Sequence, residues 1–394
     1  MKRLRVILGT IIVQMGLGTI YTWSLFNQPL VNAYGWKLNE VALTFSITSF
    51  ALAIATLFAG KLQEKWGIRR LVITAGFVLG IGLLLSSQAS SLWLLYGLAG
   101  VIVGFADGTA YITSLSNLIK WFPRRKGLIS GISVGAYGTG SLIFKYINNY
   151  FIQVVGVSHA FYYWGGIVMF LVIGGALLLS EAKGSEDYDN QEQSQKNYSV
   201  KEMLQTKQAY LLFIIFFTAC MSGLYLIGIV KDIGVNLAHL NLETAANAVA
   251  LVAIFNTIGR IVLGALSDQV GRLKVIAAAL FVTATAVTII STLPLTKGIF
   301  FVVVAAIAFC FGGNITIFPA LVADFFGLKN QSKNYGMIYQ GFGLGALAAS
   351  SVAVLLGGFA PTFTLIACLN GVSFIIVLFI KSPQAHNNSL PQSP

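Results

Sequence analysis

The sequence has 394 residues, of which 56% are hydrophobic and only 10% are charged, and its formal net charge is +12. A soluble domain with a hydrated surface carries more charge than this, so the composition excludes a soluble globular protein. The sequence also contains no phosphate-binding glycine loop followed by lysine, no metal-ligand cluster and no nucleophile–base set, so we expect no enzyme, no cofactor and no metal site.

The predicted elements are membrane-spanning helices. A helix needs about 20 apolar residues to cross a bilayer, and twelve segments meet this requirement. They predict an all-α membrane protein. In chain order the twelve spans fall near residues 5–32, 38–59, 71–89, 92–119, 128–151, 160–180, 208–232, 243–266, 273–293, 298–325, 335–358 and 361–381.

The basic residues are distributed unevenly between alternate loops. With a cytoplasmic N-terminus, the outer loops keep only Lys37, Lys145, Lys231 and Lys297. Loops rich in Lys and Arg stay in the cytoplasm, so we expect the N- and C-termini to be cytoplasmic. The net positive charge then reflects topology and contact with membrane lipids, and it does not predict nucleic-acid binding.

Asp107 lies about midway along the fourth span, where an ionised carboxylate costs about 3 kcal/mol on a translocon-based scale. It is therefore expected to be paired or protonated, which makes it a candidate proton carrier. Tyr111 follows one turn later on the same helical face. The alternative is a protonated acid that makes a structural hydrogen bond between helices.

Residues 181–207 interrupt the apolar pattern with acidic residues and glutamines, which is typical of a solvated linker. This linker divides a first six-helix bundle, residues 1–180, from a second, residues 208–381, and a disordered tail is expected at residues 382–394. Within the linker, Ser199 and Glu202 have capping-box spacing, which predicts the start of a short helix.

Lys231 and Asp232 lie at the outer end of the seventh span. Long side chains at that level reach interfacial water, which is a structural explanation for their position. The alternative is a gating role, in which the two residues form an ion pair that breaks when the transport path opens.

Arg260 is the only charged residue between Glu243 and Asp268, within the predicted eighth span. A buried guanidinium needs an anionic partner, and a ligand that brings its own negative charge would supply it. Asn256 lies four residues earlier on the same face, where it could bind the same ligand or hold the guanidinium. The alternatives for Arg260 are a structural pair with a carboxylate from another helix, or snorkelling toward the cytoplasmic face.

The two halves come into register when the sequence is shifted by about two hundred residues, which indicates duplication. The loop Gly264–Arg272 of the second half resembles the motif between helices eight and nine of the major facilitator superfamily, and a weaker copy starts at Gly60. A carboxylate at a helix end that faces basic residues can latch one conformation. Asp268 and Arg272 are therefore candidate gating residues, and a plain solvated turn is the alternative.

The segment Lys120–Gly127, with the sequence KWFPRRKG, resembles the loop between helices four and five of the oxalate/formate antiporter family. The segments Tyr21–Phe26 and Asn256–Arg260 also fit this family, and the similarity runs across nearly the whole chain. The resemblance implies a major facilitator fold with two pseudo-symmetric six-helix bundles in a bacterial cytoplasmic (inner) membrane. It further implies that Arg260 binds the substrate. We expect a monomer.

The eleventh span departs from the family pattern. Oxalate exchangers resemble Tyr-x-x-Lys-Gly at this point, whereas this chain has Tyr339 followed by Phe342, so the second cation is absent. One arginine neutralises a monoanion but leaves the second carboxylate of a dianion uncompensated. Phe342 therefore favours pyruvate, lactate or formate over oxalate as the substrate.

Helices one, four, seven and ten line the cavity in this superfamily. Tyrosine hydroxyls can hydrogen-bond a keto or carboxylate oxygen, although aromatic residues in membrane helices also simply pack. The candidate tyrosines are Tyr21, Tyr111, Tyr225 and Tyr339.

The sequence thus predicts a secondary transporter of a small monocarboxylate, coupled to protons through Asp107, in which two bundles rock around a central cavity by alternating access. The alternatives are an anion exchanger of the oxalate/formate type, a non-transporting anion sensor and, disfavoured by Arg260, a drug exporter.

Overall fold

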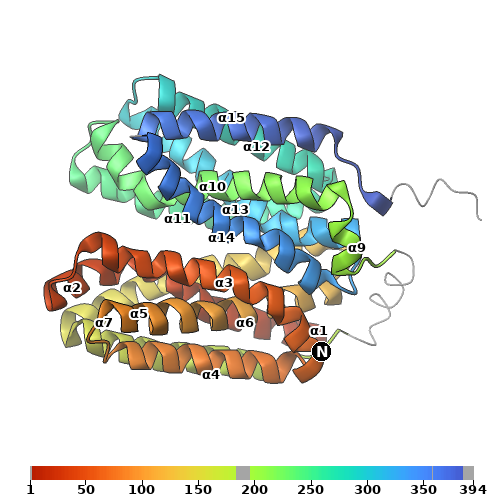
Figure 1. Ribbon diagram of the computed structural model, residues 1–394, viewed down its shortest axis with the longest axis horizontal. Coiled ribbons are helices and arrows are strands. Elements are labelled where there is room, and N and C mark those ends of the chain that lie inside the picture. The colour runs from red at the N-terminus through yellow and green to blue at the C-terminus, as the bar shows by residue number, and fades with distance from the viewer. Residues whose placement is uncertain (1, 183–195, 357, 385–394) are drawn as a thin grey trace, which may run out of the picture. The chain divides into compact units, whose positions relative to one another are not determined.

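A computed structural model describes residues 2–182, 196–356 and 358–384 (Figure 1). Within these ranges the chain forms helices and no strand. The chain divides into two compact units: unit 1 comprises Met1–Trp121 with Ser133–Ser185, and unit 2 comprises Phe122–Ile132 with Glu186–Pro394. The first turns of the fifth span therefore belong to unit 2.

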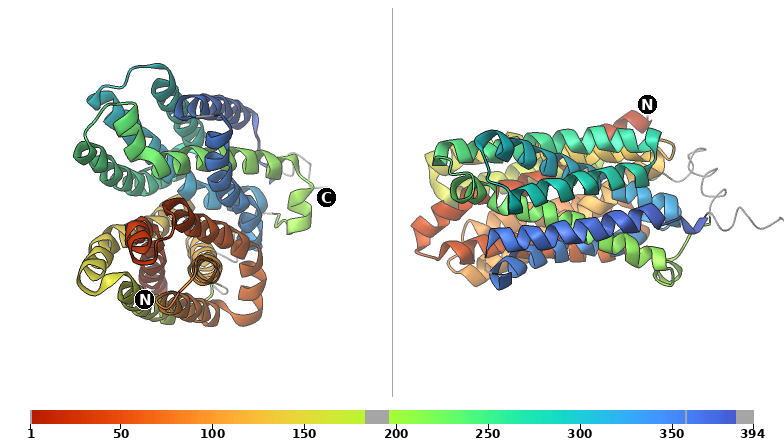
Figure 2. Two further views of the ribbon diagram at one scale, coloured as in Figure 1. Left: turned by 60° about the vertical axis from the view of Figure 1, so that its left-hand side comes forward. Right: turned by 90° about the horizontal axis from the view of Figure 1, so that it is seen from above.

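Unit 1 holds the first six membrane spans, and its helices run alongside one another (Figure 2). Its elements in chain order are α1 (Lys2–Gly18), η1 (Thr19–Thr22), α2 (Ser24–Tyr34), α3 (Leu38–Trp66), α4 (Ile68–Ser86), α5 (Leu92–Leu95), η2 (Tyr96–Ile102), α6 (Val103–Trp121) and α7 (Lys126–Leu177).

The first span is not one continuous helix, although the sequence predicted one near residues 5–32. A 3-10 turn, η1, separates α1 from α2. At this break Gly18 lies against the backbone of Tyr137 in α7, where an added Cβ atom would approach the carbonyl oxygen to 1.8 Å. Only glycine allows the two backbones to come this close. A 3-10 segment within a longer helix often marks a hinge.

Helix α7 contains two membrane spans that meet at Gly156. Its φ of 79° and ψ of 166° are not helical, so the helices on either side of it are distinct. Glycine adopts a positive φ readily because it has no Cβ atom. These two helices are the fifth and sixth spans, which the sequence placed near residues 128–151 and 160–180.

Unit 2 holds the other six membrane spans and one short helix before them. Its elements are α9 (Val200–Leu204), α10 (Lys207–Asn236), α11 (Leu242–Val270), α12 (Arg272–Thr292), α13 (Lys297–Phe326), α14 (Gln331–Leu356) and α15 (Phe359–Phe379).

The described residues confirm the predicted twelve-helix membrane fold. They contain 10 candidate spans that are long and apolar enough to cross a bilayer. One of these is α7, which supplies two helices because of Gly156. The remaining helix is α14, with 26 residues.

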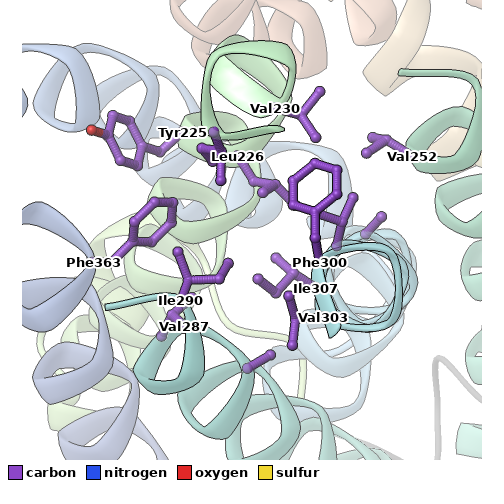
Figure 3. Close-up of a cluster of buried hydrophobic side chains, with 14 of the residues drawn as sticks. Tyr225, Leu226, Val230, Val252, Val287, Ile290, Phe300, Val303, Ile307 and Phe363 are labelled. Carbon is purple, nitrogen blue, oxygen red and sulfur yellow. The ribbon is translucent and has the colours of Figure 1, made fainter. Parts of the chain in front are cut away.

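The core of unit 2 lies where α10, α11, α12, α13 and α15 meet (Figure 3). Phe300 and Ile307 are fully buried in it, and Tyr225 packs against Phe363 with ring centroids 5.1 Å apart. Lipid tails are as apolar as these side chains, so burial from lipid adds little free energy. Close van der Waals packing between the helices stabilises the core instead.

Helices α11 and α13 pack with their backbones close together. A Cβ atom on Gly259 would come within 2.1 Å of the Phe309 carbonyl oxygen, and one on Gly312 within 2.1 Å of the Asn256 carbonyl oxygen. Small residues at a helix crossing permit this approach. The crossing fixes α11, the helix that carries Arg260, against α13.

The described part of the linker confirms the predicted capping box. The Ser199 hydroxyl accepts a hydrogen bond from the backbone N–H of Glu202, and the Glu202 carboxylate accepts one from the backbone N–H of Ser199. The hydrogen bonds from the Ser199 backbone and hydroxyl lower the pKa of the Glu202 carboxyl. Most of the linker and tail expected from the sequence, at residues 183–195 and 385–394, lies outside the described residues.

Candidate functional site

Arg260 lies in the C-terminal half of α11 and is only 2% exposed. The exposed face of the same helix is apolar, with Ile254, Ile258 and Ile261 each more than 40% exposed. Arg260 therefore points away from the face that meets lipid. This burial argues against a side chain that snorkels to water, since a snorkelling guanidinium has to reach the interface.

Asn256 lies one turn before Arg260 and is 7% exposed. Its side-chain Nδ2 donates a hydrogen bond of 3.2 Å to the carbonyl oxygen of Ala308 in α13. A carboxamide has two N–H donors, so this bond uses one of them. Asn256 thus helps to fix α11 on α13, one turn from the guanidinium.

Tyr339 and Phe342 stack in α14, with ring centroids 5.1 Å apart and an angle of 15° between the ring planes. Both side chains are at most 3% exposed. Three further buried rings complete this aromatic cluster, which comprises Phe216, Phe318, Tyr335, Tyr339 and Phe342. Phe342, at the position where the family resemblance implied lysine, is thus part of a packed apolar group.

Tyr225 is 4% exposed and belongs to the core of unit 2. Figure 3 shows its ring beside Phe363 and its hydroxyl directed away from the apolar cluster. This placement favours the packing role for the ring. Lys231 and Asp232 lie within α10, but their side chains are outside what the structure describes.

Asp107 in α6 is completely buried. Its Oδ1 atom accepts a hydrogen bond of 3.2 Å from the hydroxyl of Tyr137 in α7, which is itself 3% exposed. Its Oδ2 atom is buried and has no hydrogen-bond partner among the described residues. Tyr137 was not predicted as a partner of Asp107, because a tyrosine among small residues in the fifth span resembles any packed aromatic residue.

The tyrosines predicted for unit 1 surround the same pair. The Tyr137 ring lies edge-on to Tyr21, at 5.1 Å between centroids, and edge-on to Tyr111, at 5.7 Å. Unit 1 therefore brings together Asp107, Tyr21 and Tyr111, three of the residues singled out from the sequence. Tyr137 connects them.

Four charged residues form a cluster at the turn between α11 and α12, which we call the turn cluster: Lys126, Asp268, Arg272 and Asp324. Lys126 Nζ lies 2.7 Å from Asp324 Oδ1, and Arg272 is bonded to both Asp268 and Asp324. Opposite charges alternate through the cluster, so its formal net charge is zero. All four residues belong to unit 2.

Asp268 also caps the start of α7. Its two carboxylate oxygens accept hydrogen bonds of 2.9 Å and 2.8 Å from the backbone N–H groups of Gly127 and Leu128. The first N–H groups of a helix have no partner within it, and the helix dipole favours a negative charge there. Asp268 and Arg272, predicted to act as a latch, are thus in direct contact at a helix end.

Lys126 and Asp324, which complete the turn cluster, were not among the candidate gating residues predicted from the sequence. Lys126 looks like one more basic loop residue, yet it is 1% exposed. Asp324 closes a long apolar span, and its equivalent in the first half at a shift of 204 residues is Lys120. No repeated motif therefore marks Asp324 in the sequence.

The described residues contain no group of three or more His, Cys, Asp or Glu residues that could hold a metal ion. A groove of about 660 Å³ on α11, α12 and α13 is lined by apolar side chains and Lys274, and none of the residues singled out from the sequence lines it.

The long apolar helices are those of a multi-pass membrane protein. The family profile described as Major Facilitator Superfamily matches residues 6–238 and again residues 209–394. The chain belongs to this superfamily. The two overlapping matches together cover nearly the whole chain.

The chain is 44% identical over 341 residues to the "Uncharacterized MFS-type transporter YhjX" of Escherichia coli (strain K12), covering 86% of this chain and 85% of that protein. It is 28% identical over 387 residues to the "Oxalate:formate antiporter" of Oxalobacter formigenes, covering 95% of this chain and 90% of that protein. These matches confirm the family resemblance predicted from the sequence.

Among solved structures, the proton:xylose symporter XylE matches with a TM-score of 0.76 at 12% identity, covering 97% of this chain and 96% of that chain. A likeness at such low identity shows the fold alone. It confirms the twelve-helix architecture independently of the sequence match.

Proposed function

We propose that this protein is a secondary active transporter of a small monocarboxylate of the pyruvate, lactate or formate class. The observation that carries the proposal is the burial of Arg260 within an otherwise apolar membrane helix. A guanidinium in that environment is costly unless an anion neutralises it. A planar carboxylate fits the two parallel N–H donors of arginine, so a substrate carboxylate is the proposed anion.

The proposed preference for a monoanion rests on Phe342. Oxalate carries two carboxylates, whereas pyruvate, lactate and formate carry one. Phe342 is stacked on Tyr339 and supplies no second positive charge. One guanidinium neutralises one carboxylate, and the second carboxylate of a dianion would be uncompensated in a low-dielectric site. In this proposal Tyr339 and Asn256 help to orient the anion, and Tyr21, Tyr111 and Tyr225 are further candidate contacts.

Proton symport is the proposed coupling, with Asp107 as the proton carrier. A buried carboxyl with one hydrogen bond and no cation among its described contacts suits a group that gains and loses a proton. Anion exchange is the second candidate. The 28% identical relative is named an antiporter, and an Arg260 without its anion would resist the return step of a symporter.

The proposed gate includes the turn cluster. Alternating access requires contacts that hold one conformation and break in the other. Asp268 bonds the start of α7 directly and contacts Arg272, so breaking these bonds would free α7 from α11. Lys231 and Asp232 remain gating candidates. We propose that the protein works as a monomer in a bacterial inner membrane, with both termini cytoplasmic.

Transport by the purified protein in liposomes tests the proposal. Labelled pyruvate, lactate and formate are offered to empty vesicles, with and without an inward proton gradient. We expect uptake of at least one of them that increases with the gradient. Uptake that occurs only when the vesicles are preloaded with unlabelled anion would establish exchange instead. Binding without counterflow would indicate a sensor.

A further inference from the structure

Tyr137 is the donor that the structure assigns to Asp107. The two residues lie on different helices, α7 and α6, and are 3% and 0% exposed. The Tyr137 hydroxyl lies 3.2 Å from Asp107 Oδ1. Both residues belong to unit 1.

The surroundings of Asp107 contain other hydroxyls but no described cation. The titratable groups around the pair are Tyr137 from α7, Tyr21 from η1 and Tyr111 from α6. Helix α3 meets α6 at Gly104 and Gly108 through backbone carbonyls. Helix α1 contributes the amide of Gln14, which donates to the Tyr111 carbonyl oxygen and to Ser114.

An ionised Asp107 would therefore depend on Tyr137 for a hydrogen bond. A hydrogen bond to a charged acceptor is stronger than one to a neutral acceptor. The hydroxyl consequently favours the ionised acid more than the protonated acid. The distance between the two groups sets how readily Asp107 releases a proton.

The position of Tyr137 depends in turn on the break in the first span. Its backbone packs directly on Gly18, the last residue of α1, and its ring lies against Tyr21 in η1. One turn later, Gly140 packs on the Met15 carbonyl oxygen, where a Cβ atom would come within 2.0 Å. A change at η1 therefore has to move Tyr137 as well.

We propose that Tyr137 is a positioning residue that couples the η1 hinge to protonation of Asp107. When η1 shifts, the Tyr137 hydroxyl moves relative to Asp107 Oδ1. The Asp107 carboxyl then takes up a proton from water or releases one to water. This inference deepens the proposed function and rests on it where it concerns transport. Tyr21, a candidate substrate contact on η1, would make the proton step responsive to the bound anion.

The substitution Tyr137→Phe tests the transport consequence, because it removes only the hydroxyl and keeps the ring. Labelled pyruvate is the probe, in counterflow and in uptake driven by a proton gradient. We expect counterflow within about twofold of the unmodified protein. The midpoint of the pH profile of driven uptake should move upward by about one pH unit, since the lost hydrogen bond favoured the ionised acid.

Two matched variants bracket this result. Tyr162→Phe removes a hydroxyl from a 54% exposed tyrosine in the sixth span and should leave both assays unchanged. Asp107→Asn should abolish the response of uptake to the proton gradient while counterflow persists. A Tyr137→Phe protein with an unaltered pH profile would overturn the proposal, and so would equal loss of counterflow and driven uptake in a folded protein.

Infrared spectroscopy tests the pairing without any substrate. The carbonyl stretch of protonated Asp107 is identified as the band that disappears in Asp107→Asn. We expect this band to shift in Tyr137→Phe and also in Gly18→Ala, which pushes the hinge against Tyr137. A band at the same frequency in the unmodified protein, in Tyr137→Phe and in Gly18→Ala would refute the pairing. If pyruvate is not transported at all, the proposed function fails while the band shift still decides this inference.

Discussion

Lys126 Nζ lies 2.7 Å from Asp324 Oδ1, and this contact connects the first turn of α7 to the last turn of α13. Lys126 is 1% exposed, whereas Asp324 remains about one third exposed. Loss of the partner would therefore cost more free energy at the lysine, whose charge would remain buried, than at the aspartate.

The substitution Asp324→Asn should destabilise the protein by about 1–3 kcal/mol. A fully buried pair loses about 3–5 kcal/mol when one partner is removed, and the exposure of Asp324 reduces that effect through solvent screening. Thermal unfolding of the purified protein in detergent measures it. The control is Glu40→Gln, which removes a charge from the exposed pair with Lys37 and should change stability little. Equal stability of the two variants would contradict a stabilising ion pair between Lys126 and Asp324.

A double-mutant cycle separates the pair from its surroundings. Lys126→Met removes the charge and keeps most of the side-chain length. If the two residues interact directly, the Lys126→Met and Asp324→Asn effects should not add, with a coupling of at least about 0.5 kcal/mol. Additive effects would show that Asp324 acts mainly through Arg272.

The substitution Asp268→Ala should release the start of α7. It removes both acceptors of the Gly127 and Leu128 N–H groups. We expect faster hydrogen exchange at these two amides and a lower maximum transport rate, with pyruvate affinity within about twofold. The matched control is Glu64→Ala at the equivalent position of the first half. This variant leaves the Asp268 carboxylate in place, so exchange at the Gly127 and Leu128 amides should not change.

The substitution Phe342→Lys should shift selectivity toward dianions. It supplies a second cation, so competition by oxalate against labelled pyruvate should improve by about tenfold, which corresponds to about 1.4 kcal/mol. Phe342→Leu is the control, because it removes the stack on Tyr339 without adding charge. Oxalate competition that is equal in both variants would argue against Phe342 as a determinant of substrate charge.

The substitution Gly259→Ala should destabilise the α11–α13 crossing by about 1–3 kcal/mol, since the new methyl group would overlap the Phe309 carbonyl oxygen. Gly371→Ala on α15 is the control. No atom lies within 4 Å of its added Cβ atom, and alanine has the higher helix propensity. Thermal unfolding of both variants checks the crossing, and a Gly259→Ala protein as stable as the control would contradict it.

The membrane spans could be predicted from the sequence because each one is a long apolar run, and the bilayer sets its length. The break between α1 and α2 could not be predicted from the sequence. Residues 19–22 are as apolar and as compatible with a helix as their neighbours. At this break Gly18 packs closely on Tyr137, a contact between residues more than a hundred positions apart that the sequence does not reveal.

The buried charged residues could likewise be predicted from the sequence only in part. Arg260 and Asp107 are visible in the sequence because each is a lone charge in an apolar run. The partner of Asp107 is not visible, since Tyr137 is an ordinary residue of the fifth span. The pairing of Lys126 with Asp324 is not visible either, since Lys126 is an ordinary residue of the loop before that span. Only the fold brings Tyr137 to Asp107 and Lys126 to Asp324. Phe342 became a candidate only through comparison with a family motif.

The most direct test of the account is pyruvate binding to the Arg260→Lys variant of the purified protein. Lysine keeps the positive charge but lacks the planar pair of N–H donors. We predict that the dissociation constant for pyruvate rises by at least about tenfold in Arg260→Lys, while its thermal unfolding temperature stays the same. The control variant Arg70→Lys should bind pyruvate as tightly as the unmodified protein. An Arg260→Lys protein that binds pyruvate as tightly as the unmodified protein would contradict the assignment of Arg260 to the substrate.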